Sequence, residues 1–217
     1  MKGIHRLAAI FGPFVAAAMI MLSPVAASAV VNLTYNDTLK DIQQTDNTPC
    51  VIGSPSCSQT LPFTSVAGGP GDRDLVSPTY TVAQLEAEVG SVFNILIDIN
   101  QACGDATVCP ITLELVEVII DGVVEFLFTG PQFVPLAGSL QGNGFSDAGL
   151  ETVDLSSFAD SDTVVFHIVW SGQTDGQESF FLAPTDAPPF VAEPGTMLLL
   201  GSGLVGMAAW GRKKFRR

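Results

Sequence analysis

The sequence predicts a mainly β protein: an antiparallel β-sandwich or jelly-roll ectodomain with one short helix, plus an N-terminal signal helix and a C-terminal transmembrane helix. Apolar and polar residues alternate in 93–100 and 163–170, which is the period of a half-buried strand. Asp121-Gly122, between Ile-Ile and Val-Val, predicts a two-residue hairpin because both turn positions need positive φ. One segment, 81–90, has a helical pattern, and many strands with one helix favour two packed sheets.

The elements follow in order along the chain. Residues 32–79 are rich in Thr, Asn, Asp, Pro, Ser and Gly, so we expect an ordered, loop-rich region with a few short edge strands. Thr81 can cap the helix with Gln84 at capping-box spacing, and Gly90 can end it. The pattern of residues 152–182 is similar to the closing strands of secreted jelly-roll modules. The expected strands are residues 93–100, 111–120, 123–129, 150–156, 163–170 and 176–182.

The N-terminus has the three parts of a secretory signal. Lys2, His5 and Arg6 precede an apolar run, and Ala27-Ser28-Ala29 is a small-x-small cleavage site. We therefore expect residues 1–29 to be a signal peptide, exported through the Sec translocon and cut by signal peptidase after Ala29. The ectodomain is then residues 30–185, followed by a linker at 186–190.

The C-terminal residues 191–217 are organised as a Glu-Pro dipeptide, an apolar segment and a basic end. The apolar segment, 196–210, has 15 residues. A helix of that length reaches about 22 Å, short of the ~30 Å hydrocarbon core, which suits a temporary membrane anchor. The positive-inside rule predicts that the basic end stays in the cytoplasm and the ectodomain outside. The basic residues are Arg212, Lys213, Lys214, Arg216 and Arg217.

This tail resembles the PEP-CTERM sorting signal of Gram-negative bacteria. The resemblance covers residues 191–217 and rests on Glu193-Pro194-Gly195-Thr196, the Leu/Gly segment and the Trp-Gly-Arg-Lys-Lys ending. It implies processing by an exosortase, a membrane transpeptidase, and association with bacteria that make exopolysaccharide and biofilm. One departure is that Ala192 stands where the motif has its first proline. The motif residues here are Ala192, Glu193, Pro194, Gly195 and Thr196.

The ectodomain is strongly acidic once both end segments are set aside. Residues 30–190 hold two basic residues, Lys40 and Arg73, against 21 acidic ones, a net charge of −19, whereas the whole chain has −13. Such a body is repelled by phosphates, so we exclude nucleic acid as a partner. A solvated acidic surface and a surface that binds divalent cations both fit this charge.

The four cysteines fall into two local pairs, Cys50 with Cys57 and Cys103 with Cys109. Four cysteines allow three connectivities, and closeness in sequence favours the local one. Neither pair has C-x-x-C spacing and no histidine lies near, so we expect disulfides rather than zinc.

Calcium is the one cofactor that the sequence suggests. Asp98 with Asn100, and Asp175 with Glu178, are candidate ligands, as is Asp147 with Asn143, although none has EF-hand spacing. Asp and Asn also populate loops for backbone reasons, so turn chemistry is the alternative.

No residue pattern predicts catalysis. His167 lies in an alternating strand, where a structural role is expected, and with 21 acids in the body the proximity of two in sequence carries no information. Trp170 and Tyr80 could stack on sugars, although the apolar face of Trp170 favours the core.

The expected function is therefore that of a non-enzymatic envelope or extracellular-matrix protein working with exopolysaccharide. We expect transient inner-membrane anchoring, then release to the cell surface or matrix. A carbohydrate-binding module, with or without structural calcium, is the first alternative, and a secreted hydrolase is the second.

Overall fold

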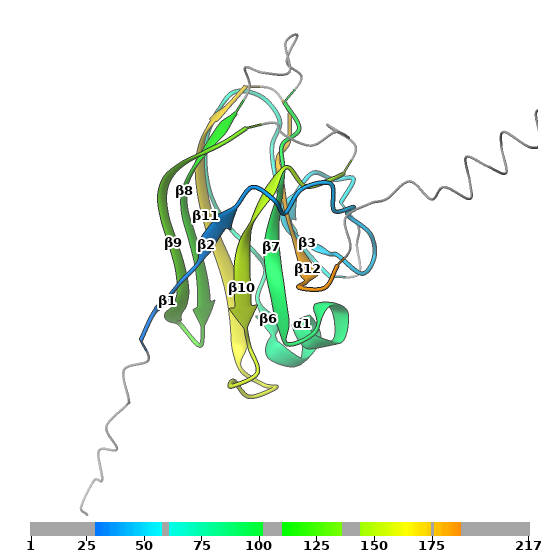
Figure 1. Cartoon of the computed structure of the whole chain (residues 1–217), viewed down its shortest axis with the longest axis vertical. Helices are drawn as coiled ribbons and strands as arrows, with labels where there is room; N and C mark the ends of the chain where they lie inside the picture. Colours follow the sequence, from blue (N-terminus) through cyan, green and yellow to red (C-terminus); the bar gives the residue numbers. More distant parts are fainter. Residues whose placement is uncertain (1–28, 58–60, 102–109, 136–143, 175, 188–217) are drawn as a thin grey trace, which may run out of the picture.

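The structure is a computed structural model that describes residues 29–57, 61–101, 110–135, 144–174 and 176–187 (Figure 1). Two six-stranded sheets and one short helix make up the described part. The prediction of a mainly β protein with one short helix is confirmed. The predicted signal helix and the transmembrane helix at 196–210 lie outside the described residues. Within those residues no helix has the length and apolar character that a membrane crossing requires.

The first sheet has the strand order β1-β9-β8-β11-β5, with β6 also pairing with β11. Every pairing in it is antiparallel except that of β1 with β9. Its strands are β1 (Val31–Asn32), β5 (Gly71–Val76), β6 (Tyr80–Thr81), β8 (Ile111–Ile120), β9 (Val123–Val134) and β11 (Thr163–Gln173).

The second sheet has the order β2-β10-β7-β12-β3-β4. Its strands are β2 (Thr34–Asn36), β3 (Cys50–Gly53), β4 (Thr64–Ser65), β7 (Val92–Asp98), β10 (Ala148–Asp154) and β12 (Ser179–Pro184). Only Leu33 separates β1 from β2, so the chain passes from one sheet to the other there. Antiparallel sheets were predicted, but β1 pairs with β9, and β3 with β4, in parallel, so both sheets are mixed.

The β8–β9 hairpin forms as predicted at Asp121-Gly122, where φ is 48° and 80°. Strand β9 does not end at Thr129, as expected from Gly130-Pro131, but continues to Val134. At Gly130 the backbone passes so close to the Leu113 carbonyl oxygen that a Cβ would collide with it. Glycine therefore permits the close approach of β9 to β8 at a bulge, and the strand continues through it. The prediction that Gly130-Pro131 ends the strand was wrong.

The helix α1 (Val82–Val89) has the predicted capping box. The Gln84 backbone N–H donates to the Thr81 hydroxyl over 3.2 Å, and the Thr81 N–H donates to the Gln84 side-chain oxygen over 2.9 Å. Val82, Leu85 and Val89 are buried, and Gly90 follows the last turn at φ 78°. Docking of this apolar face compensates for the low stability of so short a helix.

The main core lies between the two sheets. Trp170 of β11 contacts Phe180 of β12 with ring centroids 5.0 Å apart, and Phe166 lies 6.4 Å from Phe93 of β7. Trp170 has no exposed surface and Tyr80 is 1% exposed, with its hydroxyl donating to the Pro62 carbonyl over 2.7 Å. The suggestion that these two rings stack on sugars is therefore wrong, and the core assignment of Trp170 is right.

The outer face of the second sheet is covered as well. Leu96 of β7 and Phe181 of β12 form a second apolar cluster with Ile42, Cys50 and Cys57, which belong to the loop-rich N-terminal region. Strand β7 is consequently buried on both faces, including Asn94 and Asp98. The prediction of a half-buried strand was wrong, because polar residues at alternate positions there face protein and not water.

Candidate functional site

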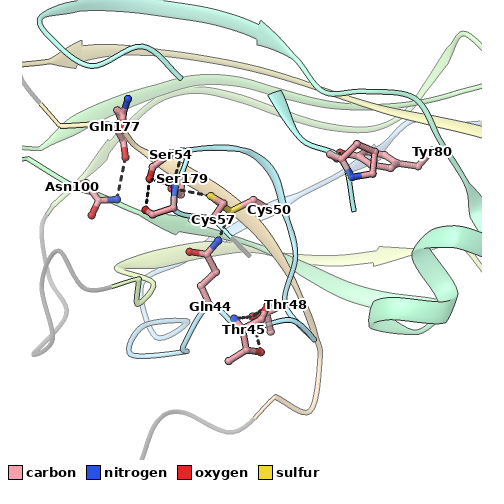
Figure 2. Close-up of a disulfide and its surroundings, with 12 residues drawn as sticks. Gln44, Thr45, Thr48, Cys50, Ser54, Cys57, Tyr80, Asn100, Gln177 and Ser179 are labelled. Carbon is pink, nitrogen blue, oxygen red and sulfur yellow. Dashed lines mark hydrogen bonds between the residues drawn. A yellow bond between two sulfur atoms is a disulfide. The ribbon is translucent and has the colours of Figure 1, made fainter. Parts of the chain in front are cut away.

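A disulfide closes the loop that lies over the second sheet. Cys50 and Cys57 are bonded with their Cα atoms 5.9 Å apart, as the local pairing predicts (Figure 2). Both cysteines are buried, and the Cys57 N–H donates to the Ser54 carbonyl over 2.9 Å. The other predicted pair, Cys103 and Cys109, lies outside the described residues.

A polar cavity of about 350 Å³ lies beside this disulfide, and we call it the disulfide pocket. Strand β7 supplies Asp98, and Asn100 follows it; Ser179 comes from β12, and Ser54 and Gln44 come from the covering loops. Figure 2 shows Gln44, Ser54 and Ser179 beside the cysteines, and Asn100 beyond them with its side-chain amide donating to the Gln177 carbonyl. Hydroxyl and amide groups therefore dominate a cavity that a carboxylate also lines.

Asp98 is the carboxylate of this pocket. It is 2% exposed, and its Oδ1 atom has no hydrogen-bond partner among the described residues. Strand register places Ser179 of β12 opposite Asp98 on one side. On the other side Ala148 pairs with Ile97, so Asp147, the residue before Ala148, lies opposite Asp98. Burial raises the pKa of Asp98 to about 7, a hydrogen bond from Asn100 opposes that rise, and the negative charge of Asp147 adds to it.

The predicted calcium ligands are only partly brought together. Asp98 and Asn100 line the same pocket, whereas the buried Glu178 accepts the Asn100 backbone N–H over 2.7 Å and the Gln101 side-chain amide. Asp147 accepts the Ile99 N–H over 2.8 Å, and Asp175 lies outside the described residues. In the part of the chain that the structure describes, no three His, Cys, Asp or Glu side chains are placed to hold a metal. Glu178 therefore binds a backbone N–H and a side-chain amide through its carboxylate oxygens.

His167 bridges three strands on the outer face of the first sheet. Its Nε2 lies 2.8 Å from Asp74 of β5 and its Nδ1 lies 2.7 Å from Glu117 of β8. Burial alone lowers the pKa of His167, but the hydrogen bonds and charges of the two carboxylates outweigh it and raise the pKa above 6.5. Because carboxylates engage both ring nitrogens, this geometry gives His167 a structural role.

A second cavity, of about 480 Å³, lies where the chain passes from β1 to β2, and we call it the crossing groove. Glu125 of β9 and Glu151 and Asp154 of β10 line it, together with Phe126 and Phe158. Val31 and the polar residues Asn32, Thr34, Thr152, Ser156 and Ser157 complete the lining. Sequence reasoning missed this groove, because Glu125 and Glu151 belong to different sheets and no local pattern joins them.

Backbone strain accompanies the crossing groove. Thr152 has φ 60°, a left-handed conformation that is rare for a β-branched residue, at the bulge between Leu150 and Val153. The Asn94 side chain holds it, since Asn94 Oδ1 accepts the Thr152 N–H over 3.1 Å. Strain of this kind clusters at functional sites, which makes the groove a candidate binding site.

The comparisons with known proteins identify the C-terminus. The family profile of the PEP-CTERM protein-sorting motif matches residues 191–213, as the resemblance of the tail implied. This motif indicates a secreted protein that is targeted to an exosortase, which is its processing partner. The motif residues, the basic end and the Ala27 signal site lie outside the described residues. No curated protein and no solved structure matches the chain.

Proposed function

We propose that the protein is a non-enzymatic component of the cell envelope or extracellular matrix that associates with exopolysaccharide. The observation that carries this proposal is the sorting motif at residues 191–213. The folded part supports it, because a disulfide and a doubly covered second sheet suit a protein that persists outside the cell. In this proposal the tail anchors the precursor in the inner membrane until the exosortase cuts it.

The experiment compares the wild-type chain with a Glu193→Ala/Pro194→Ala double variant in a host that has an exosortase. Wild-type protein should lose its tail and reach the surface or matrix, and the variant should keep its tail and stay with the inner membrane. Mass spectrometry of the C-terminus reads out the tail. A mature wild-type protein that still carries residues 196–217 would contradict the processing step.

A second arm tests the polysaccharide. Purified wild-type protein should co-sediment with the host's own exopolysaccharide, and it should shift from the matrix fraction to the medium in a strain that makes none. Equal distribution in both strains would refute the association while leaving the sorting result intact.

The crossing groove favours carbohydrate binding as a second candidate function. Carboxylates and hydroxyls can accept and donate hydrogen bonds to sugar hydroxyls, and Phe126 and Phe158 supply apolar surface. Three carboxylates repel anionic sugars, so we propose a neutral, hydroxyl-rich saccharide as the ligand.

Glycan-array binding of wild-type protein and of Glu125→Gln tests this candidate. Glu125→Gln should weaken binding to a neutral glycan at least tenfold, whereas Glu86→Gln, the same change on the helix away from the groove, should not. No retention of any neutral glycan would refute it. Release of new reducing ends from a bound glycan would instead favour the hydrolase alternative and overturn the non-enzymatic proposal.

A further inference from the structure

Asp98 is a buried acid that forms no ion pair with a basic side chain of the described residues. The residue is 2% exposed and its Oδ1 lacks a hydrogen-bond partner within the described ranges. Asp147, a second buried carboxylate, lies beside it, directly before β10. Two like charges side by side in a protein interior are strongly unfavourable unless a cation or a proton accompanies them.

The described basic side chains do not supply that cation. Lys40 is exposed, and Arg73 donates to the carbonyl oxygens of Ala67 and Gly69. Neither forms a salt bridge with Asp98. Compensation must therefore come from a bound proton or from an ion that enters the pocket.

The disulfide pocket has the chemistry of a hard-cation site. Asp98 lines it together with Asn100, Ser54 and Ser179, whose side chains contain neutral oxygens, and its volume of about 350 Å³ leaves room for an ion with several waters. Ca²⁺ accepts carboxylate, amide, hydroxyl and water oxygens in flexible geometry, whereas Mg²⁺ demands a near-ideal octahedron. The irregular origin of the lining, from two strands and two loops, suits Ca²⁺ better.

We propose that the disulfide pocket binds a Ca²⁺ ion through the Asp98 carboxylate, with Asn100, Ser54, Ser179 and water completing the shell. One carboxylate among mostly neutral ligands gives weak binding, because affinity rises with ligand charge. Extracellular calcium modules bind with Kd about 10⁻⁴–10⁻³ M, and the site should lie in that range. The proposal is independent of the proposed association with polysaccharide.

Calorimetry and thermal unfolding of the purified protein test the site, with Ca²⁺ as the probe after treatment with a chelator. A hundredfold excess of Ca²⁺ over its Kd should raise the Tm of the wild-type protein by roughly 5–10 °C. Asp98→Asn should lose the shift and weaken binding at least tenfold. Asp160→Asn, an equal charge change at an exposed residue, is the matched control and should keep both.

Ser179→Ala provides a second variant that removes a neutral ligand without touching a charge. It should bind Ca²⁺ several-fold more weakly than the wild-type protein, and Mg²⁺ should give a smaller Tm shift than Ca²⁺ at equal concentration. Absence of a Ca²⁺-dependent shift in the wild-type protein, or equal shifts in wild type and Asp98→Asn, would overturn the proposal.

Discussion

Replacing Asp98 with asparagine should change how the stability of the metal-free protein depends on pH. The pKa of Asp98 rises from 3.8 to about 7 on folding, chiefly through burial. A carboxyl with a raised folded-state pKa binds its proton more tightly in the folded protein. The stability that it contributes is therefore complete below pH ~4 and is lost as the pH rises to about 7. At about 1.4 kcal/mol per pH unit, the loss is about 4 kcal/mol.

Asparagine has the same shape and no charge, so it avoids this loss. The difference in free energy of unfolding between Asp98→Asn and wild type should shift by about 4 kcal/mol in favour of the variant between pH 4 and pH 8. Other titrating groups are common to both proteins and cancel in this comparison.

The assay is urea denaturation of both proteins in chelator at several pH values, followed by tryptophan fluorescence of the buried Trp170. A difference that stays constant within about 1 kcal/mol from pH 4 to pH 8 would refute the reasoning, because a buried ionising carboxyl requires it to change. A variant that is less stable by the same amount at every pH would show that Asp98 acts through packing alone.

Three further predictions concern other parts of the molecule. Cys50→Ala/Cys57→Ala should lose about 2.5 kcal/mol of stability in urea melts, as expected for a bond with a sequence separation of 7, and a loss below about 1 kcal/mol would contradict it. Glu117→Gln should lower the pKa of His167, and an NMR titration of this histidine can measure the change; an unchanged pKa would count against the ion pair. Because the pKa of His167 in the folded wild-type protein is raised above 6.5, the pair stabilises the fold below pH 6.5, and this contribution is lost as the pH rises through the folded-state pKa. Thr152→Gly should raise stability by about 0.5–1 kcal/mol because it relieves a positive φ, while a loss of stability would show that the Thr152 side chain matters more than the strain.

Local signals predicted the local structure well. The capping box at Thr81 and Gln84 and the hairpin at Asp121-Gly122 depend on residues a few positions apart, and the structure has both. The disulfide between Cys50 and Cys57 follows for the same reason, since a short separation limits the partners available.

Which strand faces are buried, and which distant strands pair, could not be predicted from local sequence signals. The alternation along β7 indicates which side chains share a face, but the loops that cover the outer face come from a different part of the chain, around Ile42 and Cys50. The parallel pairing of β1 with β9 joins residues about 95 apart in sequence, such as Val31 and Phe126. Neither the crossing groove nor the disulfide pocket has a local sequence pattern, because each is assembled from separate strands and loops.

The end of β12 sets the length of the tether between the folded domain and the sorting motif. Strand β12 ends at Pro184 and the motif begins at residue 191, so the six residues 185–190 join them. Fully extended, they reach about 25 Å. In the proposed route, the exosortase at the membrane therefore has to bind a cutting site that lies within about 25 Å of the folded domain. Electrostatic repulsion is screened beyond about 8 Å at physiological ionic strength, so an extended tether is long enough to keep the acidic domain beyond the range of repulsion by anionic headgroups.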